Sequence, residues 1–325
     1  MNNQNINYIK YQKYKNKYLN LKNQIGGGEC EYNINESRAP SNCDRIIYRS
    51  NNIHFIDYNI ITKNEFNLIQ FSDHKMIYGI FNYNLENYMI ISWNIGAFDH
   101  KFDKKYESYI TSHINKFINE IIKKKYIKYL IFSFQESTNN SLFIEILKNM
   151  INEQLNMTLL KHILSNPLFS KFYVQLLVFT NNENTTIDDS GYYNLQVNNY
   201  NEQNIINILI QSIKNLFGTK SYVYIKMNNL MIVSTHFPID TKHKDLGNSL
   251  RKLALEEIDK KFKEDTNLII IGDLNFRKLN NIDQLDDLLK EKTDFKEAGK
   301  LLDTTCKYDE CKLKCDNTTC TTTNK

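Results

Sequence analysis

The stretch RAPSNCDRII, residues 38–47, and the segment FSDH, residues 71–74, decide how this chain is interpreted. A length of strand-like sequence separates them. They supply Asp44 and His74, an acid and an imidazole that can form a hydrogen-bonded dyad. Both residues lie near the start of the chain, whereas a strand that ends in acidic and amide residues, residues 268–277, lies near the other end. The fold prediction depends on whether these distant segments form one site.

Apolar, β-branched and aromatic runs alternate with helix-like segments from residue 43 onward. The expected strands are residues 45–48, 76–81, 88–95, 129–134, 172–180, 221–226, 230–235 and 268–271. The expected helices are residues 104–125, 141–155, 204–216 and 246–263. Short turns between several strands predict mixed sheets, and the Asn-rich residues 181–204 are interpreted as a surface loop. The fold class is α/β, a sandwich of mixed sheets with helices outside.

Polar residues follow several of the expected strands at the point where each apolar run stops. The run Leu268 to Ile271 leads into Gly272, Asp273, Leu274 and Asn275. Asp273 and Asn275 are two residues apart, so on a strand they point to the same side. Each of these residues also fits an ordinary turn or a core position. Similar strand ends carry Asn94, Glu136 and His236. Together they would supply hard oxygen ligands for Mg²⁺ and hydrogen-bond donors for a phosphate group.

These motifs resemble those of the endonuclease/exonuclease/phosphatase superfamily. The matching segments are Trp93-Asn94, Gln135-Glu136, Ser234-Thr235-His236, Gly272-Asp273-Leu274-Asn275, Asp44-Arg45-Ile46 and Ser72-Asp73-His74. They span most of residues 38–277, and they look most like the inositol polyphosphate 5-phosphatase branch. The resemblance implies a DNase I-like, four-layered α/β sandwich.

The order of the motifs departs from that family. There the Cys-Asp-Arg and Ser-Asp-His segments close the chain, whereas here they precede Trp93-Asn94. Residues 305–309, Thr-Cys-Lys-Tyr-Asp, resemble the element that precedes Cys-Asp-Arg in 5-phosphatases. We therefore expect a circular permutation, which is tolerated where new ends fall in exposed loops. It would bring the chain's six cysteines, which lie only near its two ends, around the cut.

The resemblance also implies a role for each residue in a magnesium-dependent phosphoesterase. Glu136, assisted by Asn94, holds Mg²⁺ against a phosphate oxygen. Asp273 orients or deprotonates the attacking water. Asp44 holds His74 in one tautomer beside Asp73, so that the imidazolium stabilises the transition state. The hydrogen-bond donors to the phosphoryl oxygens are Asn275 and His236.

The substrate implied is a phosphoinositide or a soluble inositol polyphosphate. Lys307 and Arg38 match positions that recognise a further ring phosphate in 5-phosphatases, and Lys220 matches a basic position near the scissile phosphate. Solvated surface residues are the alternative interpretation of Lys307 and Arg38. Asn42 and Cys306 also depart from the Trp and Tyr of the family. The rival functions are a nuclease of the same superfamily, acting on DNA or RNA, and a non-catalytic virion or scaffold protein that keeps the fold.

The bulk properties predict an intracellular protein. The 325 residues carry a formal net charge of +4, which gives little reason to predict a general nucleic-acid binder. Neither a spanning apolar run nor a signal peptide is apparent. Residues 1–28 predict a basic amphipathic leader helix with a Gly linker, for docking or, alternatively, for contact with a membrane or nucleic acid. It resembles the leaders of giant DNA virus proteins. Residues 29–325 are expected to form one catalytic domain. We expect reduced thiols, with disulfides between the two ends as the alternative.

Overall fold

The computed structural model divides the chain into two compact units, residues 41–299 and residues 1–40 with 300–325. The structure describes residues 43–61, 66, 68, 72, 74, 76–96, 99, 104–139, 141–165, 172–195, 220–237, 244–276, 278–279, 282–291, 294–298, 312–315 and 320–323. The described part of the second unit is an antiparallel hairpin of β15 (Lys312–Cys315) and β16 (Cys320–Thr323). The predicted leader helix lies outside the described residues, so the boundary at residue 28 stays a prediction.

Residues 41–299 contain two six-stranded mixed sheets. The first has the order β2-β3-β4-β5-β7-β6, and only β4 and β5 are parallel. Its strands are β2 (His54–Ile61), β3 (Met76–Tyr83), β4 (Glu86–Asn94), β5 (Tyr129–Ser137), β6 (Thr158–Leu164) and β7 (Tyr173–Thr180). The central strands are buried along almost their whole length, which explains their unbroken apolar sequences.

The second sheet has the order β14-β1-β11-β10-β9-β8, with β10 and β11 parallel. Its strands are β1 (Asp44–Arg49), β8 (Ile187–Asn194), β9 (Ser221–Met227), β10 (Leu230–His236), β11 (Leu268–Asp273) and β14 (Lys296–Glu297). A further small hairpin consists of β12 (Lys278–Leu279) and β13 (Ile282–Asp283). Strand β1, from the start of the described chain, pairs in antiparallel fashion with β11.

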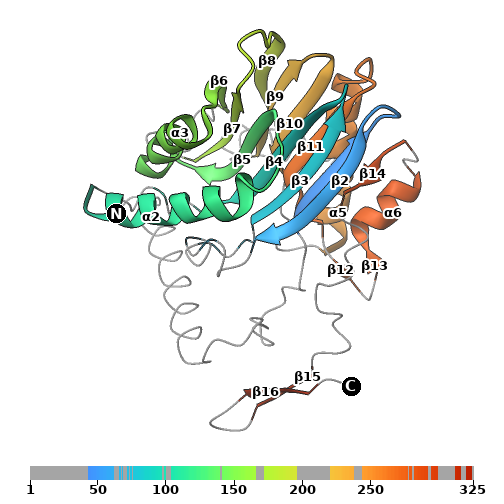
Figure 1. The fold of residues 1–325 in the computed structure, drawn as a ribbon. Helices are drawn as coiled ribbons and strands as arrows, with labels where there is room; N and C mark the ends of the chain where they lie inside the picture. The colour runs from blue at the N-terminus through green and yellow to red at the C-terminus, as the bar shows by residue number, and fades with distance from the viewer. Residues whose placement is uncertain are drawn as a thin grey trace, which may run out of the picture. The chain divides into compact units, whose positions relative to one another are not determined.

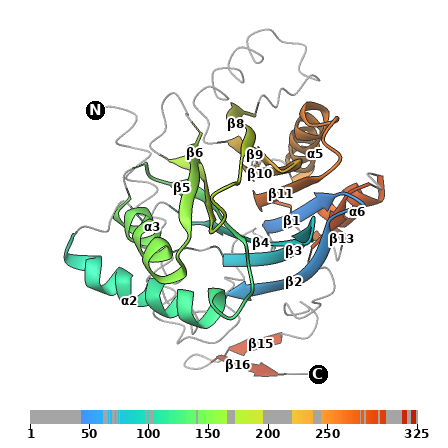
Figure 2. The same ribbon diagram turned by 45° about the horizontal axis from the view of Figure 1, so that its top comes forward.

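Three apolar clusters show that the sandwich has four layers. The central cluster combines Ile90 and Ile131 of the first sheet with Ile225, Ile232 and Ile271 of the second. A second cluster packs the outer face of the first sheet against α2 (Glu107–Phe117) and α3 (Leu142–Leu155). The third packs the outer face of the second sheet against α5 (Lys244–Lys261) and α6 (Gln284–Glu291). Figures 1 and 2 show these helices on opposite sides of the paired sheets.

The predicted fold class is confirmed, with local corrections. The predicted surface loop is wrong at residues 187–194, which form the edge strand β8. This strand is exposed along much of its length, so its sequence IDDSGYYN is polar and does not indicate a strand. The predicted helix 104–125 is a 3-10 turn (Lys104–Tyr106), α2 and a π-helical turn (Ile118–Ile122). The predicted helix 204–216 lies outside the described residues. In the part of the chain described, no helix is long and apolar enough to cross a membrane.

Candidate active site

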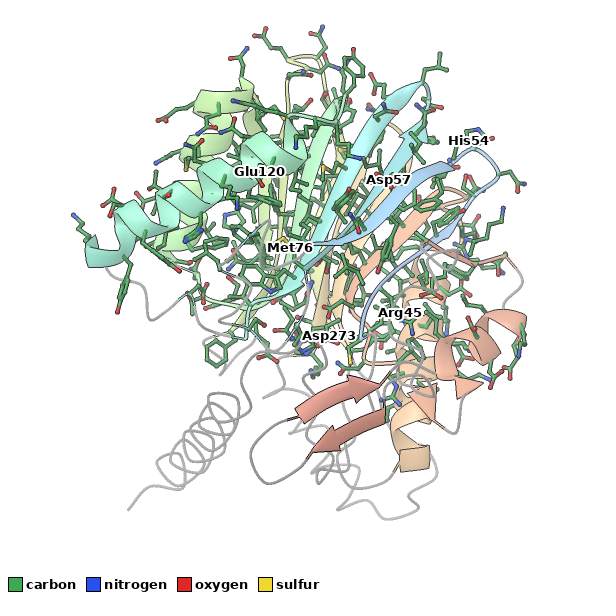
Figure 3. All side chains as sticks on the ribbon, turned by 60° about the horizontal axis from the view of Figure 1, so that its bottom comes forward. Arg45, His54, Asp57, Met76, Glu120 and Asp273 are labelled. Carbon is green, nitrogen blue, oxygen red and sulfur yellow. The ribbon has the colours of Figure 1, made fainter. Side chains whose placement is uncertain are left out.

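The strand order brings the polar strand ends together at one end of the sandwich. Because β10 and β11 are parallel, His236 pairs with Asp273, and because β1 is antiparallel to β11, Asp44 also pairs with Asp273. In the facing sheet, the parallel pair β4 and β5 places Asn94 beside Gln135, one residue before Glu136. Figure 3 shows Asp273 at the end of the strands away from His54. The two segments separated in sequence therefore share one site.

Asp273 is the centre of this site. Its carboxylate is fully buried. Asn94 Nδ2 donates a hydrogen bond to Asp273 Oδ2 at 2.9 Å, and the Nε2 atoms of His236 and His74 lie 3.3 and 3.7 Å from the same oxygen. The other oxygen, Oδ1, accepts a hydrogen bond from the backbone N–H of Asn275 at 3.2 Å. The site thus surrounds one carboxylate with nitrogen atoms from both sheets.

The surroundings keep Asp273 ionised. Burial alone would raise the pKa of this carboxyl group, but nearby His74, His236 and Lys220 together hold it well below its usual range. An ionised acid is able to accept a proton or a hydrogen bond from a water molecule. The electrostatics therefore keep Asp273 charged and able to accept a hydrogen bond from water, while the lowered pKa makes it a weaker base than an ordinary carboxylate.

The dyad expected from the sequence is present. His74 Nδ1 lies 2.9 Å from Asp44 Oδ2, and the Nε2 atom of the ring faces Asp273. Ser72 fixes this segment: its hydroxyl donates to the backbone oxygen of Asn94 at 2.6 Å and accepts from the backbone N–H of His74 at 3.0 Å. With Asp44 as acceptor, Nδ1 carries the proton in the neutral ring. The roles of Asp44 and His74 in catalysis stay predictions.

His236 and Lys220 form the cationic side of the site. His236 is buried, and its Nε2 atom contacts Lys220 Nζ and lies 3.7 Å from Glu136 Oε1. Burial lowers the pKa of Lys220 to about 8, although Asp273 and Glu136 act in the opposite direction. Burial and the Lys220 charge also lower the pKa of His236. Lys220, predicted to bind substrate, therefore contacts His236, which is predicted to be catalytic.

Glu136 and Asn94 are the predicted metal ligands. The Glu136 side chain is 33% exposed, and Asn94 Oδ1 accepts a hydrogen bond from the backbone N–H of Gly96 at 2.9 Å. No group of three or more His, Cys, Asp or Glu side chains that suits a metal ion is found among the described residues. Mg²⁺ ordinarily binds through one or two carboxylates with water and substrate phosphate, so the partly exposed carboxylate of Glu136 is a ligand of the kind that Mg²⁺ takes.

The backbone after β11 corrects one detail of the sequence prediction. Strand β11 ends at Asp273, and Asn275 has a left-handed backbone with φ of 55°. Asn275 therefore lies beyond the strand, and the alternation of side chains along a strand does not place it on the same side as Asp273. Asn275 Nδ2 donates to the backbone oxygen of Phe237 at 2.9 Å, which ties this loop to the end of β10. The proposed contact of Asn275 with a phosphoryl oxygen would use its remaining N–H.

Three predicted site residues lie outside the described residues, and the sequence prediction did not include three polar residues that the structure places near the site. Those not described are Arg38, Asp73 and Lys307. The missed residues are Ser137, which follows Glu136, and Asp99 and Gln175, which hydrogen-bond to Ser137; all three are buried and polar. Gln175 is marked in the sequence as a lone amide within the apolar run YVQLLVF, whereas nothing in the sequence marks Asp99.

Comparison with known proteins found structural similarities only. No protein-family model and no curated protein matches the sequence. The structure is similar to the crystal structure of SmcL, with 17% identity, a TM-score of 0.38, and 62% of this chain and 67% of that chain covered. It is also similar to the endonuclease/exonuclease/phosphatase from Bacteroides vulgatus, with 15% identity, a TM-score of 0.38, and 62% of this chain and 70% of that chain covered. A third similar structure is TDP2 from Caenorhabditis elegans, with 14% identity, a TM-score of 0.34, and 58% of this chain and 48% of that chain covered. This chain therefore spans about half the length of that protein.

Proposed function

We propose that this chain is a magnesium-dependent phosphoesterase of the endonuclease/exonuclease/phosphatase superfamily with its motifs in rotated order. The observation that carries the proposal is the buried Asp273 carboxylate, which has Asn94, His236 and His74 around one oxygen. A structural carboxylate needs one cation or a few N–H donors, and burying several charged groups together is costly without a functional reason. The more exposed Glu136 beside this cluster supplies the hard ligand that the chemistry requires.

Each residue of the candidate site has a proposed role toward a phosphate group held at its edge. Glu136 and Asn94 would hold Mg²⁺, which neutralises charge that develops on the phosphate oxygens. Asp273 accepts the proton of a water molecule or aligns it for attack on phosphorus. His74, oriented by Asp44, donates from Nε2 when protonated and so stabilises the transition state. Asn275 is a further donor to the phosphoryl oxygens. His236 is another when Lys220 is uncharged, because a charged Lys220 leaves Nε2 of His236 as an acceptor.

The substrate we propose is an inositol polyphosphate or a phosphoinositide. Support comes from the sequence, in which Arg38, Lys307 and Lys220 match basic positions of the 5-phosphatase pattern. Guanidinium and ammonium groups are the side chains that recognise additional phosphates. The contact of Lys220 with His236 supports a position close to the scissile phosphate.

The test compares phosphate release from inositol polyphosphates and short-chain phosphoinositides with cleavage of DNA and RNA, each with Mg²⁺ and with EDTA. We expect Mg²⁺-dependent phosphate release, reduced at least about 1,000-fold in Asp273→Asn, because the base is lost without a change of shape. Asp57→Asn is the control, since Asp57 lies on β2, away from the site, and forms an ion pair with Lys125. Cleavage of nucleic acid alone would assign the chain to the nucleases, and no turnover of either kind would support the scaffold interpretation.

A further inference from the structure

Glu136 projects from an irregular point in β5. In the pairing of β5 with β7, Phe134 lies opposite Gln175 and Ser137 lies opposite Tyr173. Two residues of β5, Gln135 and Glu136, therefore oppose the single residue between them on β7, which is the pattern of a β-bulge. Glu136 has φ of 52°, a left-handed conformation that side chains other than Gly disfavour. The bulge redirects the Glu136 carboxylate, and surrounding contacts must hold it in place.

Gln175 on β7 provides one set of these contacts. Its Nε2 atom donates to Ser137 Oγ at 2.8 Å and to the backbone oxygen of Thr138 at 2.7 Å. Its Oε1 atom lies 2.8 Å from His162 Nε2. Gln175 is completely buried, and a buried amide is costly unless its hydrogen bonds are made. All of these bonds are made, and two of them clamp the residues that follow Glu136.

Asp99 provides the second set. Its Oδ2 atom accepts from Ser137 Oγ at 2.9 Å, from the backbone N–H of Thr138 at 2.9 Å and from Thr138 Oγ1 at 3.1 Å. Asp99 is 1% exposed. A buried carboxylate that accepts several hydrogen bonds is strongly anchored, because leaving it without them would be costly. Ser137 and Thr138 are therefore fixed from both sides.

The two ends of this network determine the direction of every hydrogen bond in it. Lys148 Nζ on α3 lies 3.1 Å from His162 Nδ1, and an ammonium group is only a donor. His162 Nδ1 is then the acceptor, so Nε2 carries the proton and donates to Gln175 Oε1. Gln175 in turn donates to Ser137, and Ser137 donates to Asp99, whose carboxylate is only an acceptor. The chain of donors from Lys148 to Asp99 is therefore consistent in direction at every step.

We propose that Gln175 and Asp99 are positioning residues for Glu136, holding the bulge so that the carboxylate faces the metal and substrate phosphate. The proposal rests on the proposed function, in which Glu136 is the metal ligand. Gln175 is a single amide in a strand whose next four residues, Leu176 to Phe179, are buried and apolar, so packing of the strand alone does not explain an amide at this position. Residues that orient a metal ligand typically change metal affinity by 10- to 100-fold when they are replaced.

The experiment measures Mn²⁺ binding to the full chain, from the electron paramagnetic resonance of free Mn²⁺, together with hydrogen exchange of the amides of Ser137 and Thr138. For Gln175→Met we expect Mn²⁺ affinity to fall by about 10-fold or more and exchange at these amides to rise. Asp99→Ala should behave in the same way, whereas Asp99→Asn, which keeps the side-chain acceptor, should change both quantities less. The matched control is Asn267→Leu, which removes a buried amide bonded to Ser50 and Tyr83 away from the site.

Each outcome separates this inference from the proposed function. If wild type binds Mn²⁺ and Glu136→Gln does not, while Gln175→Met and Asp99→Ala bind like wild type, the positioning role is overturned and the metal site stands. Faster exchange without loss of affinity overturns it as well. If the control loses affinity as much as Gln175→Met, the effect is general destabilisation and the inference fails. If wild type binds no Mn²⁺, the proposed metal role of Glu136 fails, and with it the positioning role. Should Gln175→Met not fold, the two Asp99 variants make the same comparison.

Discussion

Gly272 is the glycine of the candidate site at which the backbone leaves least room for a side chain. Its φ is 142°, and a Cβ atom placed there would lie 1.9 Å from the backbone oxygen of Thr235 on the parallel neighbour β10. Any relief requires movement of one of the two strands that carry His236 and Asp273. We predict that Gly272→Ala lowers the free energy of unfolding by more than about 2 kcal/mol, measured by urea denaturation.

Gly79 gives the matched control for this prediction. A Cβ atom at Gly79 would meet Ile46 Cδ1 and Phe81 Cε2, both at 2.9 Å. These are side-chain atoms, and the end of the Ile46 side chain can move more readily than a strand. Gly79→Ala should therefore cost less than Gly272→Ala. Equal losses in the two variants would contradict the argument that the β10 backbone limits residue 272.

His162 predicts how stability responds to pH. Burial holds its pKa below the ordinary value, the hydrogen bond with Gln175 raises it in part, and the Lys148 ammonium lowers it further. Burial lowers the pKa of Lys148 itself, and the nearby charge of Glu145 raises it. The pKa of His162 in the folded state lies below the value of about 6.5 in the unfolded chain. Folding therefore favours the neutral ring. The resulting stability is complete above pH 6.5 and is lost as the pH falls from 6.5 toward the folded pKa.

The measurement compares urea denaturation of wild type and His162→Gln at pH 7.5 and pH 5.5. Other histidines, including His236, titrate in both proteins, so the difference between the two proteins isolates His162. Wild type should lose more stability than the variant over this interval. A larger loss in the variant would mean that the protonated ring is the one stabilised by folding.

At the scale of elements, the ion pair between β1 and β14 closes one edge of the second sheet. Arg45 Nη1 contacts Glu297 Oε1, and their side chains are only 8% and 6% exposed. Removal of one partner leaves a buried charge, so Arg45→Met alone should cost about 3–5 kcal/mol. The double variant Arg45→Met with Glu297→Leu should cost less than the single one, measured by urea denaturation. A double variant less stable than Arg45→Met would show that Glu297 also stabilises the fold through contacts other than the one with Arg45.

The accuracy of the strand predictions follows burial. Strands covered on both faces, such as β4 and β11, have continuous apolar sequences that indicate them directly. The edge strand β8 is exposed along much of its length, and its polar sequence lacks that pattern. Strand β6, also at an edge, was missed for a similar reason. Helix α6 has only eight residues, too few for a strong periodic pattern.

At the scale of the whole molecule, the site was predictable where it lies at strand ends. Asn94, His236 and Asp273 each follow an apolar run, and parallel pairing gathers such ends at one edge. Gln175 and Asp99 were not predictable in this way, because their contacts depend on the bulge at Glu136. A bulge depends on the register between two strands, which no single stretch of sequence encodes. The residues of the candidate site were therefore easier to predict than the buried polar residues that contact the bulge.

The proposed rotation of the motif order gives the turn between β3 and β4 a particular meaning. In the superfamily that the motifs resemble, the Ser-Asp-His segment closes the chain and Trp-Asn opens it, so this turn would be where the family's two ends are joined. Asn84 and Leu85 both have left-handed backbones, with φ of 53° and 64°, and Leu85 is 95% exposed. An exposed Leu in that conformation is costly and has no packing role.

The other end of the rotation lies next to β1. The backbone N–H of Ala298 donates to the oxygen of Ile46 at 2.9 Å, and β14 runs antiparallel to β1. From Ala298 the chain is therefore directed toward Cys43, three residues or about 10 Å along the strand. A short linker is able to span that gap, whereas the turn at Leu85 is exposed and suited to new ends.

We predict that a chain in family order folds: residues 86–299, a Gly/Ser linker of about six residues, then residues 43–83. Its urea transition should be cooperative and close to that of the unpermuted residues 41–299, because the linker replaces one short connection by another. The matched control carries the same linker but opens at Asn228 and Asn229, where Asn228 Nδ2 donates to the Tyr129 hydroxyl at 3.0 Å and Asn267 Nδ2 donates to the oxygen of Asn229 at 3.4 Å. Opening there breaks buried contacts and should cost more stability. If the chain in family order is the less stable of the two, or has no cooperative transition, the turn at Leu85 is not where the two ends were joined.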